Sequence, residues 1–209
     1  MNSFKYNNIK LTWFGHASFR IEQDGYVVYI DPYASDDYTK KANLILTTHD
    51  HFDHCDHEKM KRIMDENTKM VLNKDCVKNY YGAIPITVGD KKEVDGIMIE
   101  AVSAYNTKKP YHPKDKGVTG FIITINGTRI YHAGDTDFIP EMNMLKNIDI
   151  AFLPIGGTFT MDEIEAAKAA NLIRPKIVVP MHYNTVKDTE KDPNKFAEKV
   201  DEGIEVKIL

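Results

Sequence analysis

The feature that most restricts how this chain can fold is a cluster of metal-binding side chains directly after a short apolar strand. Residues 44–46 read LIL, and residues 47–54 continue as TTHDHFDH. Imidazole nitrogens and carboxylate oxygens are the preferred ligands of zinc and of several of its first-row neighbours. Alternate residues of an extended segment face the same side, so His49 and His51 can share one metal. Asp53 and His54 follow where the chain bends into a helix, and they can reach a second metal.

Two later residues offer ligands that could complete such a site. Asp135 follows the predicted strand 128–131, which ends in Ile130-Tyr131, in a glycine-containing turn where a carboxylate can bridge two cations. His182 stands at the end of the apolar stretch 176–181. Functional side chains gather on loops at strand ends because a rigid scaffold holds those loops. The sequence therefore predicts a metal centre assembled from both halves of the chain.

The composition is that of a globular protein and sets limits on the partners. The 209 residues are 42% hydrophobic and 28% charged, which suits a single domain over residues 1–209. The net charge of −4 gives no electrostatic signature of nucleic-acid binding. Residues 1–6 carry no apolar signal segment and no stretch reaches transmembrane length, so a cytoplasmic location is expected. The two cysteines are too few for a disulfide framework, and Cys55 is either a soft metal ligand or a packing residue.

The order of the predicted elements indicates two layers of one domain. In each half, alternating strands come first and strand–helix units follow. The turns Asp24-Gly25 and Asn126-Gly127 predict β-hairpins, and Gly15-His16-Ala17 is expected to interrupt a strand. The fold class is therefore α/β (α+β), with sheet on sheet and helices outside. Helices are predicted over 57–66, 75–81, 161–173 and 193–200, and strands over 9–14, 18–22, 26–30, 44–47, 69–72, 84–88, 92–94, 97–103, 120–125, 128–131, 149–153, 176–181 and 204–208.

Several short motifs resemble the metallo-β-lactamase superfamily of metal-dependent hydrolases. They are HDHFDH at 49–54, GDT at 134–136 and MHY at 181–183, in the order and spacing of that superfamily. The flanking words GHAS at 15–18, YHAGDT at 131–136, LPIGG at 153–157 and PMHYNT at 180–185 resemble the branch with ascorbate-6-phosphate lactonases and the phospholipase D that releases N-acylethanolamines. The resemblance implies a four-layer αββα sandwich with the metals in the cleft between its sheets.

The resemblance also assigns roles to individual residues. The metal ligands would be His49, His51, Asp53, His54, Asp135 and His182, around one or two zinc ions, with manganese, iron or nickel as alternatives. Asp135 would bridge, and Asp53 would orient a metal-bound hydroxide. The chain departs from the superfamily where the first metal usually takes a third histidine, because Asn106 stands there. Either Asn106 or His112, six residues later, would complete that site.

The chemistry implied is hydrolysis of a small, anionic ester, lactone or phosphodiester by a metal-bound hydroxide. Candidates to deliver a proton to the leaving group are His16, His112 and Tyr183, with His16 first. The alternative role of His16 is to support a metal ligand through a hydrogen bond. Lys108 and Lys109, in the polar loop 104–117, either receive an anionic group or are simply solvated. Candidate substrate-binding residues are Asn106, Lys108, His112 and Tyr183.

Two other functions stay open at this point. A non-catalytic protein that binds or senses one metal ion would explain a weakened first site. A nuclease of the ribonuclease Z kind is disfavoured by the acidic charge balance. The expected partner is a small-molecule substrate, without nucleic acid or membrane, and assembly into a homo-oligomer is left open.

Overall fold

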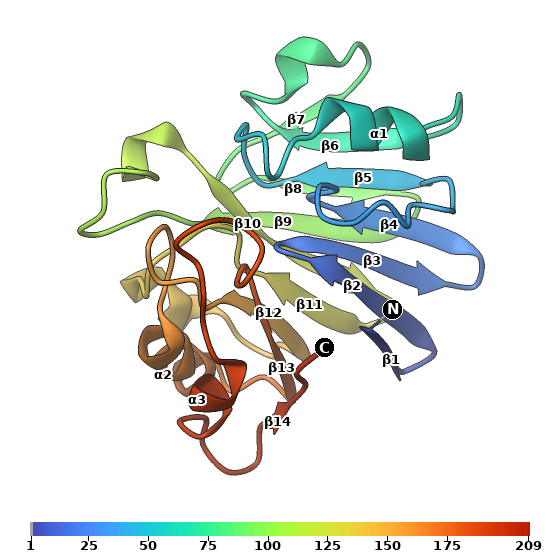
Figure 1. The fold of residues 1–209 in the computed structure, drawn as a ribbon. Coiled ribbons are helices and arrows are strands. Elements are labelled where there is room, and N and C mark those ends of the chain that lie inside the picture. Colours follow the sequence, from blue (N-terminus) through green and yellow to red (C-terminus); the bar gives the residue numbers. More distant parts are fainter. Residues whose placement is uncertain (1) are drawn as a thin grey trace. The chain divides into compact units, whose positions relative to one another are not determined.

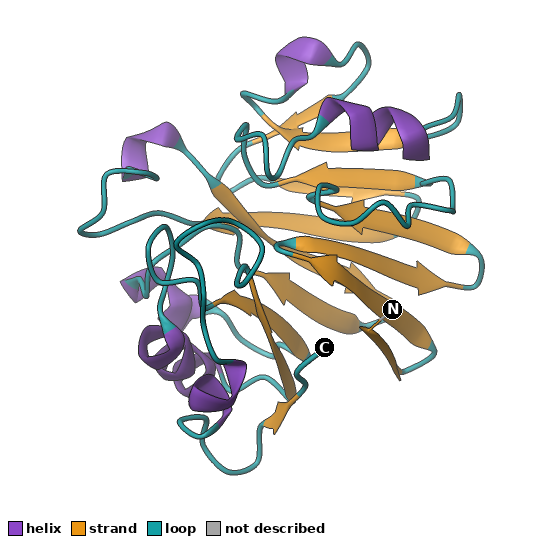
Figure 2. Ribbon diagram, in the orientation of Figure 1, coloured by secondary structure: helices purple, strands orange, loops and turns teal. Residues whose placement is uncertain are grey.

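The computed structural model describes residues 2–209 and divides them into two compact units. The first takes in the chain up to Ile86 together with Leu209, and the second runs from Thr87 to Ile208. Each unit contains one seven-stranded sheet (Figures 1 and 2). The single-domain organisation expected from the sequence stays a prediction.

The sheet of the first unit has its strands in the order of the sequence. Neighbours from β1 to β4 are antiparallel, and neighbours from β4 to β7 are parallel. The strands are β1 (Asn2–Tyr6), β2 (Ile9–Gly15), β3 (Ser18–Gln23), β4 (Tyr26–Ile30), β5 (Leu44–Thr47), β6 (Lys69–Asn73) and β7 (Ile84–Ile86).

Two of the three hairpin turns in the antiparallel half of this sheet lie at segments that the sequence analysis named. Asp24-Gly25 joins β3 to β4, as predicted, and both residues have positive φ angles. The segment at Gly15-His16-Ala17, expected to be an interruption of one strand, is instead the turn between β2 and β3. Gly15 pairs with Ser18 across it, and His16 has a φ angle of 51°. The reversal places His16 at a sheet end rather than within a strand.

Helix α1 (His57–Ile63) lies beside β5 and β6 in Figure 1. Asp56 begins it by accepting hydrogen bonds from the backbone N–H groups of Glu58 and Lys59. Met60 and Ile63 are buried in an apolar cluster with Ile45 and Leu72. The helix ends three residues before the predicted Glu66, because Met64 is extended and residues 65–68 form a turn closed by Asp65 and Thr68.

The sheet of the second unit runs in the order β14-β13-β12-β11-β10-β9-β8. Neighbours from β8 to β11 are antiparallel, including the predicted Asn126-Gly127 hairpin, and those from β11 to β14 are parallel. The strands are β8 (Lys91–Val94), β9 (Ile97–Ser103), β10 (Thr119–Ile125), β11 (Thr128–His132), β12 (Ile150–Pro154), β13 (Ile177–Met181) and β14 (Glu205–Val206).

Helix α2 (Glu163–Ile173) packs against β12 and the short helix α3 (Pro193–Ala197), which lies beside it in Figure 1. Its first turn is closed by a capping box. The Asp162 carboxylate accepts from the N–H groups of Ile164 and Glu165, and the Glu165 side chain accepts from the N–H of Asp162. The face it buries consists of small alanines and Ile173, so the helix lies close to the sheet.

The remaining differences from the sequence predictions concern short elements. Strand β1 was not predicted, and the predicted helix 75–81 is only the 3-10 turn η1 (Val77–Asn79). The Asn73 side chain accepts from the Asp75 N–H, which favours a turn over a helix there. Two further 3-10 turns are η2 (Lys114–Lys116) and η3 (Pro140–Met144). Among residues 2–209, none of the helices has the length and apolar character needed to cross a bilayer.

Candidate metal centre

In the first unit, the histidines of the predicted motif lie together in the loop after β5. The N–H groups of His54 and Cys55 both donate to the carbonyl of His51, which closes the loop into a turn. The His49 ring centroid consequently lies 4.0 Å from that of His54 and 4.6 Å from that of His51. His49 and His54 are buried and His51 is half-buried, so the turn gathers three imidazoles at one place.

A carboxylate that the sequence analysis did not single out fixes the orientation of His54. Asp31, which follows β4, lies with Oδ2 2.8 Å from His54 Nδ1 and is itself fully buried. It also accepts hydrogen bonds from the N–H and the hydroxyl of Thr48. A carboxylate at Nδ1 assigns the ring proton to that nitrogen and leaves the Nε2 lone pair for a metal. The only local signal for this role was an aspartate at a strand end.

His16 lies at the same place through Asp53. Its Nε2 is 3.1 Å from Asp53 Oδ2, and its ring centroid is 5.2 Å from that of His54. His54 Nε2 is 4.0 Å from the same carboxylate oxygen. Two predicted catalytic residues, His16 and Asp53, are therefore in direct contact. Of the two roles considered for His16, this contact supports the one in which it holds a metal-ligating carboxylate.

In the second unit, the bridging candidate Asp135 lies between two histidines. Its Oδ2 is 3.0 Å from His182 Nε2 and 3.5 Å from His112 Nε2, and all three side chains are buried. Asp135 follows β11 and His182 follows β13, so both stand at the ends of parallel strands. His112 comes from the long loop between β9 and β10, which carries η2 in Figure 2.

Contacts within the same loop show that Asn106 and His112 have different roles. The Asn106 amide oxygen accepts from the His112 N–H at 3.0 Å and lies 3.2 Å from His112 Nδ1. Its amide nitrogen donates to Asp137 and to the carbonyl of Phe159. Asn106 thus holds His112 in place, and the His112 Nε2 faces Asp135. Of the two residues left open by the sequence, the geometry favours His112 as the ligand.

Asp137 anchors this loop and was not identified from the sequence. It accepts hydrogen bonds from Asn106, from the N–H of Thr107 and from the Lys109 ammonium at 2.6 Å. Burial opposes ionisation of Asp137, but the hydrogen bonds and the charge of Lys109 lower its pKa below the usual value. Lys109 also donates to the carbonyl of Thr160. These contacts engage the Lys109 ammonium within the protein and disfavour the alternative in which it receives an anionic substrate.

The structure also describes the surroundings of Lys108, Tyr183, Cys55 and His132. Lys108 is exposed on the loop, and Tyr183 is buried, which raises the pKa of its hydroxyl. Cys55 lies in the apolar core of the first unit with Cys76, and the packing interpretation is favoured. His132 packs edge-on against Phe152 and accepts from the Gly134 N–H.

The donor chemistry of both units fits divalent metal ions. Each unit offers buried imidazole nitrogens beside a carboxylate, and in each a further oxygen acceptor fixes the Nδ1 side of one histidine. The first unit supplies His49, His51, Asp53 and His54, and the second supplies His112, Asp135 and His182. This ligand assignment stays a prediction.

Comparison with known proteins identifies the class. A family model described as a β-lactamase superfamily domain matches residues 10–182, so the chain belongs to that superfamily. Its relatives include UPF0173 metal-dependent hydrolases of Hyperthermus butylicus, 35% identical over 91% of this chain and 90% of that protein, and of Thermococcus onnurineus, 36% identical over 96% of each. The chain is accordingly a metal-dependent hydrolase of the UPF0173 group.

Solved structures support the same assignment. A metallo hydrolase from Ignicoccus hospitalis matches with a TM-score of 0.80 and 34% identity over 96% of this chain and 94% of that one. A protein of Parabacteroides distasonis, assigned to the metal-dependent hydrolases, matches with a TM-score of 0.89 and 36% identity over 99% and 96%. A Thermotoga maritima member of the metallo-β-lactamase superfamily, 22% identical with a TM-score of 0.66, shares the fold. The predicted fold class, with its two mixed sheets, is confirmed.

Proposed function

We propose that this metal-dependent hydrolase cleaves a small anionic ester, lactone or phosphodiester. The substrate class rests on the resemblance to the branch with ascorbate-6-phosphate lactonases. The observation that carries the site assignment is the pair of oriented histidines. His54 is held at Nδ1 by Asp31 and His112 by Asn106, and in both the Nε2 nitrogen faces a carboxylate. Such orientation matches what metal-ligating histidines require.

In this proposal each candidate residue has its own role in binding metal or in positioning the attacking water. His49, His51, Asp53 and His54 hold metal in the first unit, and His112, Asp135 and His182 hold metal in the second. Divalent ions held by such residues supply a Lewis acid and a water molecule of lowered pKa. Asp53 orients the attacking water, and His16 holds Asp53 through the 3.1 Å contact. Zinc is the proposed metal because nitrogen donors predominate.

The proposed substrate charge rests on the polar loop between β9 and β10. Lys108 is exposed there, while the neighbouring Lys109 is occupied by Asp137. Lys108 is thus the lysine of this pair that can meet an anionic group. Tyr183, next to His182, is the second candidate for substrate contact. The proposed partner is a small molecule, and the cytoplasmic location stays a prediction.

The test combines metal analysis with turnover. Purified protein is loaded with zinc, manganese, iron or nickel and assayed with lactones and bis(p-nitrophenyl) phosphate. We expect at least about one tightly bound metal per chain and turnover with one of these metals. The double variant His51→Ala, Asp53→Ala should lose both, while His57→Ala, which changes an exposed histidine three residues beyond the motif, should keep both.

Three results would contradict the proposal at different levels. Full activity in the double variant would refute the site. One bound metal without turnover under any loading would favour a metal-sensing protein. Equal activity on neutral and phosphorylated lactones, unchanged in Lys108→Gln, would refute the anionic substrate but leave the hydrolase intact.

A further inference from the structure

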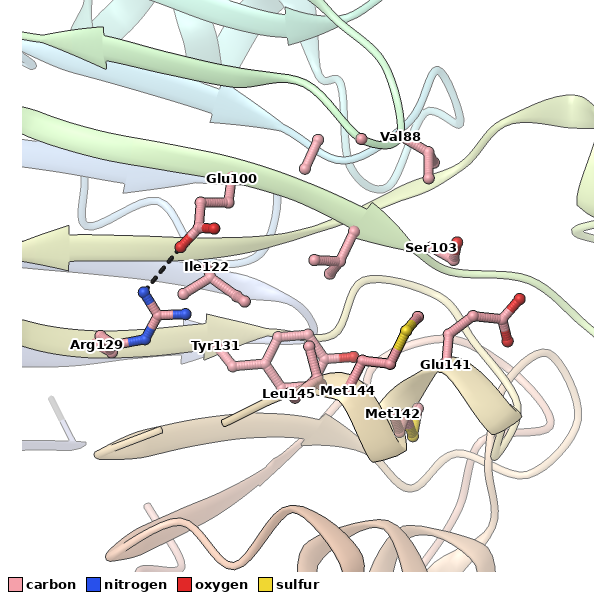
Figure 3. A pocket seen from close by; sticks show the side chains of 13 residues that line it. Val88, Glu100, Ser103, Ile122, Arg129, Tyr131, Glu141, Met142, Met144 and Leu145 are labelled. Atoms are coloured by element: carbon pink, nitrogen blue, oxygen red, sulfur yellow. Dashed lines mark hydrogen bonds and ion pairs between the residues drawn. The ribbon is translucent and has the colours of Figure 1, made fainter. Parts of the chain in front are cut away.

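A cavity in the second unit lies apart from the candidate metal ligands of that unit. It has a volume of about 280 Å³ and is bounded by β9, β10, β11 and η3 (Figure 3). None of the three candidate ligands of this unit (His112, Asp135 and His182) lines it. The cavity is open to solvent on one side, and at about 30 Å³ for each water molecule it has room for a small organic molecule.

One wall of the cavity is set by strand register. Ile122 on β10 pairs with Glu100 on β9 and with Tyr131 on β11, so the three side chains emerge on one face of the sheet. η3 supplies the opposite wall with Met142 and Met144. Figure 3 shows the Tyr131 side chain reaching toward Met144, with the Glu100–Arg129 pair along one side.

The Tyr131 hydroxyl is the unusual group in this cavity. The residue is fully buried, and within residues 2–209 no atom lies at hydrogen-bond distance from its hydroxyl. The Nε of Arg129, on the same strand, is likewise buried without a partner in the described chain. A buried donor that finds no acceptor costs stability, so native proteins rarely keep one beside an open cavity without an occupant. Burial raises the pKa of Tyr131 well above its ordinary value, so the hydroxyl remains a donor at neutral pH.

The charges around the cavity decide which occupant fits. Glu100 is paired with Arg129 at 2.8 Å and with Lys91 at 2.7 Å, and Glu141 is paired with Lys114 at 2.7 Å. The lining therefore presents compensated charges, an apolar surface of Val102, Ile122 and Leu145, and the hydroxyls of Tyr131 and Ser103, of which that of Tyr131 has no hydrogen-bond partner within residues 2–209. Tyr131 has no accessible surface with the side chains as they stand, so an occupant reaches its hydroxyl only when the flexible Met144, which is 71% exposed and toward which Tyr131 reaches, moves aside.

We propose that this cavity binds a small, neutral, mostly apolar molecule whose carbonyl oxygen accepts a hydrogen bond from Tyr131. The site is distinct from the proposed catalytic centre, and its occupation does not depend on the hydrolase reaction. A ligand of about nine non-hydrogen atoms has the size for such a cavity, with a dissociation constant on the order of a millimolar.

The test uses three probes of matched size and shape: acetophenone, isopropylbenzene and benzoate. Each is titrated into the full-length, metal-loaded protein while backbone amide resonances are followed by NMR. We expect saturable shifts from acetophenone in β9–β11 and η3, about fivefold weaker binding of isopropylbenzene, and no saturable shift in these elements from benzoate.

Two variants separate the contribution of the Tyr131 hydroxyl to probe binding from the contribution of the cavity's shape. Tyr131→Phe should weaken acetophenone binding about fivefold, to the level of isopropylbenzene, and leave isopropylbenzene binding unchanged. The matched control is Tyr29→Phe, which removes a buried hydroxyl that already donates to the carbonyl of Lys40 in the first unit. It should not change the affinity for either probe.

Four outcomes would overturn the proposal. Equal affinities for acetophenone and isopropylbenzene would mean that the Tyr131 hydroxyl takes no part in binding, and no saturable binding of either would mean that the cavity holds only water. Shifts confined to residues 49–54 would place the probe at the metal centre. A wild-type oligomer that dissociates in Met144→Asp, measured by sedimentation, would mean that a second copy of the chain covers this face.

Discussion

At the scale of single residues, the candidate metal centre depends on hydrogen bonds to the side of each imidazole that faces away from a metal. Asp31 accepts three hydrogen bonds, one from the His54 imidazole and two from Thr48, and it does so from a backbone with a φ angle of 45°. An asparagine accepts that backbone conformation but replaces one acceptor oxygen with a donor.

The substitution Asp31→Asn should therefore lower metal affinity about 10- to 100-fold, because His54 loses its fixed tautomer. Competition with a chromogenic chelator measures the effect. Asp24→Asn is the matched control, since Asp24 also has a positive φ angle but lies in the β3–β4 turn. Unchanged affinity in Asp31→Asn would show that His54 needs no such support.

The Lys109–Asp137 ion pair leads to a second prediction at this scale, which concerns how the unfolding free energy depends on pH. The pKa of Asp137 is lower in the folded protein than its ordinary value of 3.8, so the carboxylate stabilises the fold above that pH and loses its contribution as the pH falls below it. Lys109→Gln should cost about 1–2 kcal/mol of unfolding free energy at pH 7, and the difference from wild type should shrink below about pH 4. Urea unfolding at several pH values measures it.

The control for that experiment is the neighbouring lysine. Lys108 is exposed, so Lys108→Gln should change the unfolding free energy by less than about 0.5 kcal/mol at any pH. A difference between wild type and Lys109→Gln that stays constant down to pH 3 would refute the role of the ion pair.

Sequence reasoning found the histidines of the site but not the residues that support them. His49 to His54 stand within one short motif, so their shared chemistry is visible locally. Asp31 contacts His54 from a different strand end, and Asp137 contacts Lys109 and Asn106 from across the sheet. No spacing in the chain marks such pairs, because only the paired strands bring them together.

At the scale of elements, the turn after β12 and the end of β13 approach each other closely. A Cβ atom added at Gly156 would lie 2.4 Å from the carbonyl oxygen of His182, and His182 itself has a φ angle of 56°. The two strands pair in parallel, so both ends are fixed by the sheet and neither can move away freely.

Gly156→Ala should consequently displace His182 and lower both stability, by about 1–3 kcal/mol, and metal affinity. Gly96→Ala is the control for backbone strain alone, since Gly96 has a positive φ angle but no atom within 4 Å of an added Cβ. The two variants are compared by urea unfolding and by metal content. Equal loss of stability with full metal content in both would show that His182 tolerates the shift.

Elements with strong local signals were predicted well, and those fixed by packing were not. The Asp24-Gly25 and Asn126-Gly127 hairpins follow from turn chemistry, whereas α2 begins at Glu163, two residues after the predicted start at Met161, because Asp162 caps it. Strand β1 and the turn η3 carry little local preference. β1 exists because it pairs along its length with β2.

At the scale of the whole molecule, candidate ligands follow the parallel strands of both sheets. Loss of the metal should therefore destabilise the folded chain as a whole. A ligand at 100 times its dissociation constant contributes about 2.7 kcal/mol, which a chelator would remove and added metal would restore. Thermal unfolding with and without EDTA measures this change.

Variants from each unit show whether both ligand sets bind the metal. His51→Ala and His182→Ala should each reduce the rise in Tm that the metal produces, while His57→Ala should leave it intact. A metal-dependent rise in Tm that survives His182→Ala would mean that His182 holds no metal.

The mixed construction of each sheet has a kinetic consequence. Ile125 pairs with Thr128 across a tight turn, whereas Ile150 pairs with Ile177 only after the whole of α2 has been placed between them. Longer loops cost more entropy to close, so the hairpins can form before the parallel pairings that carry Asp135 and His182. We therefore expect a saturating cation to slow unfolding and to leave the refolding rate nearly unchanged, as measured by stopped-flow in both directions. A cation that speeds refolding instead would mean that the ligand loops are ordered before the rate-limiting step.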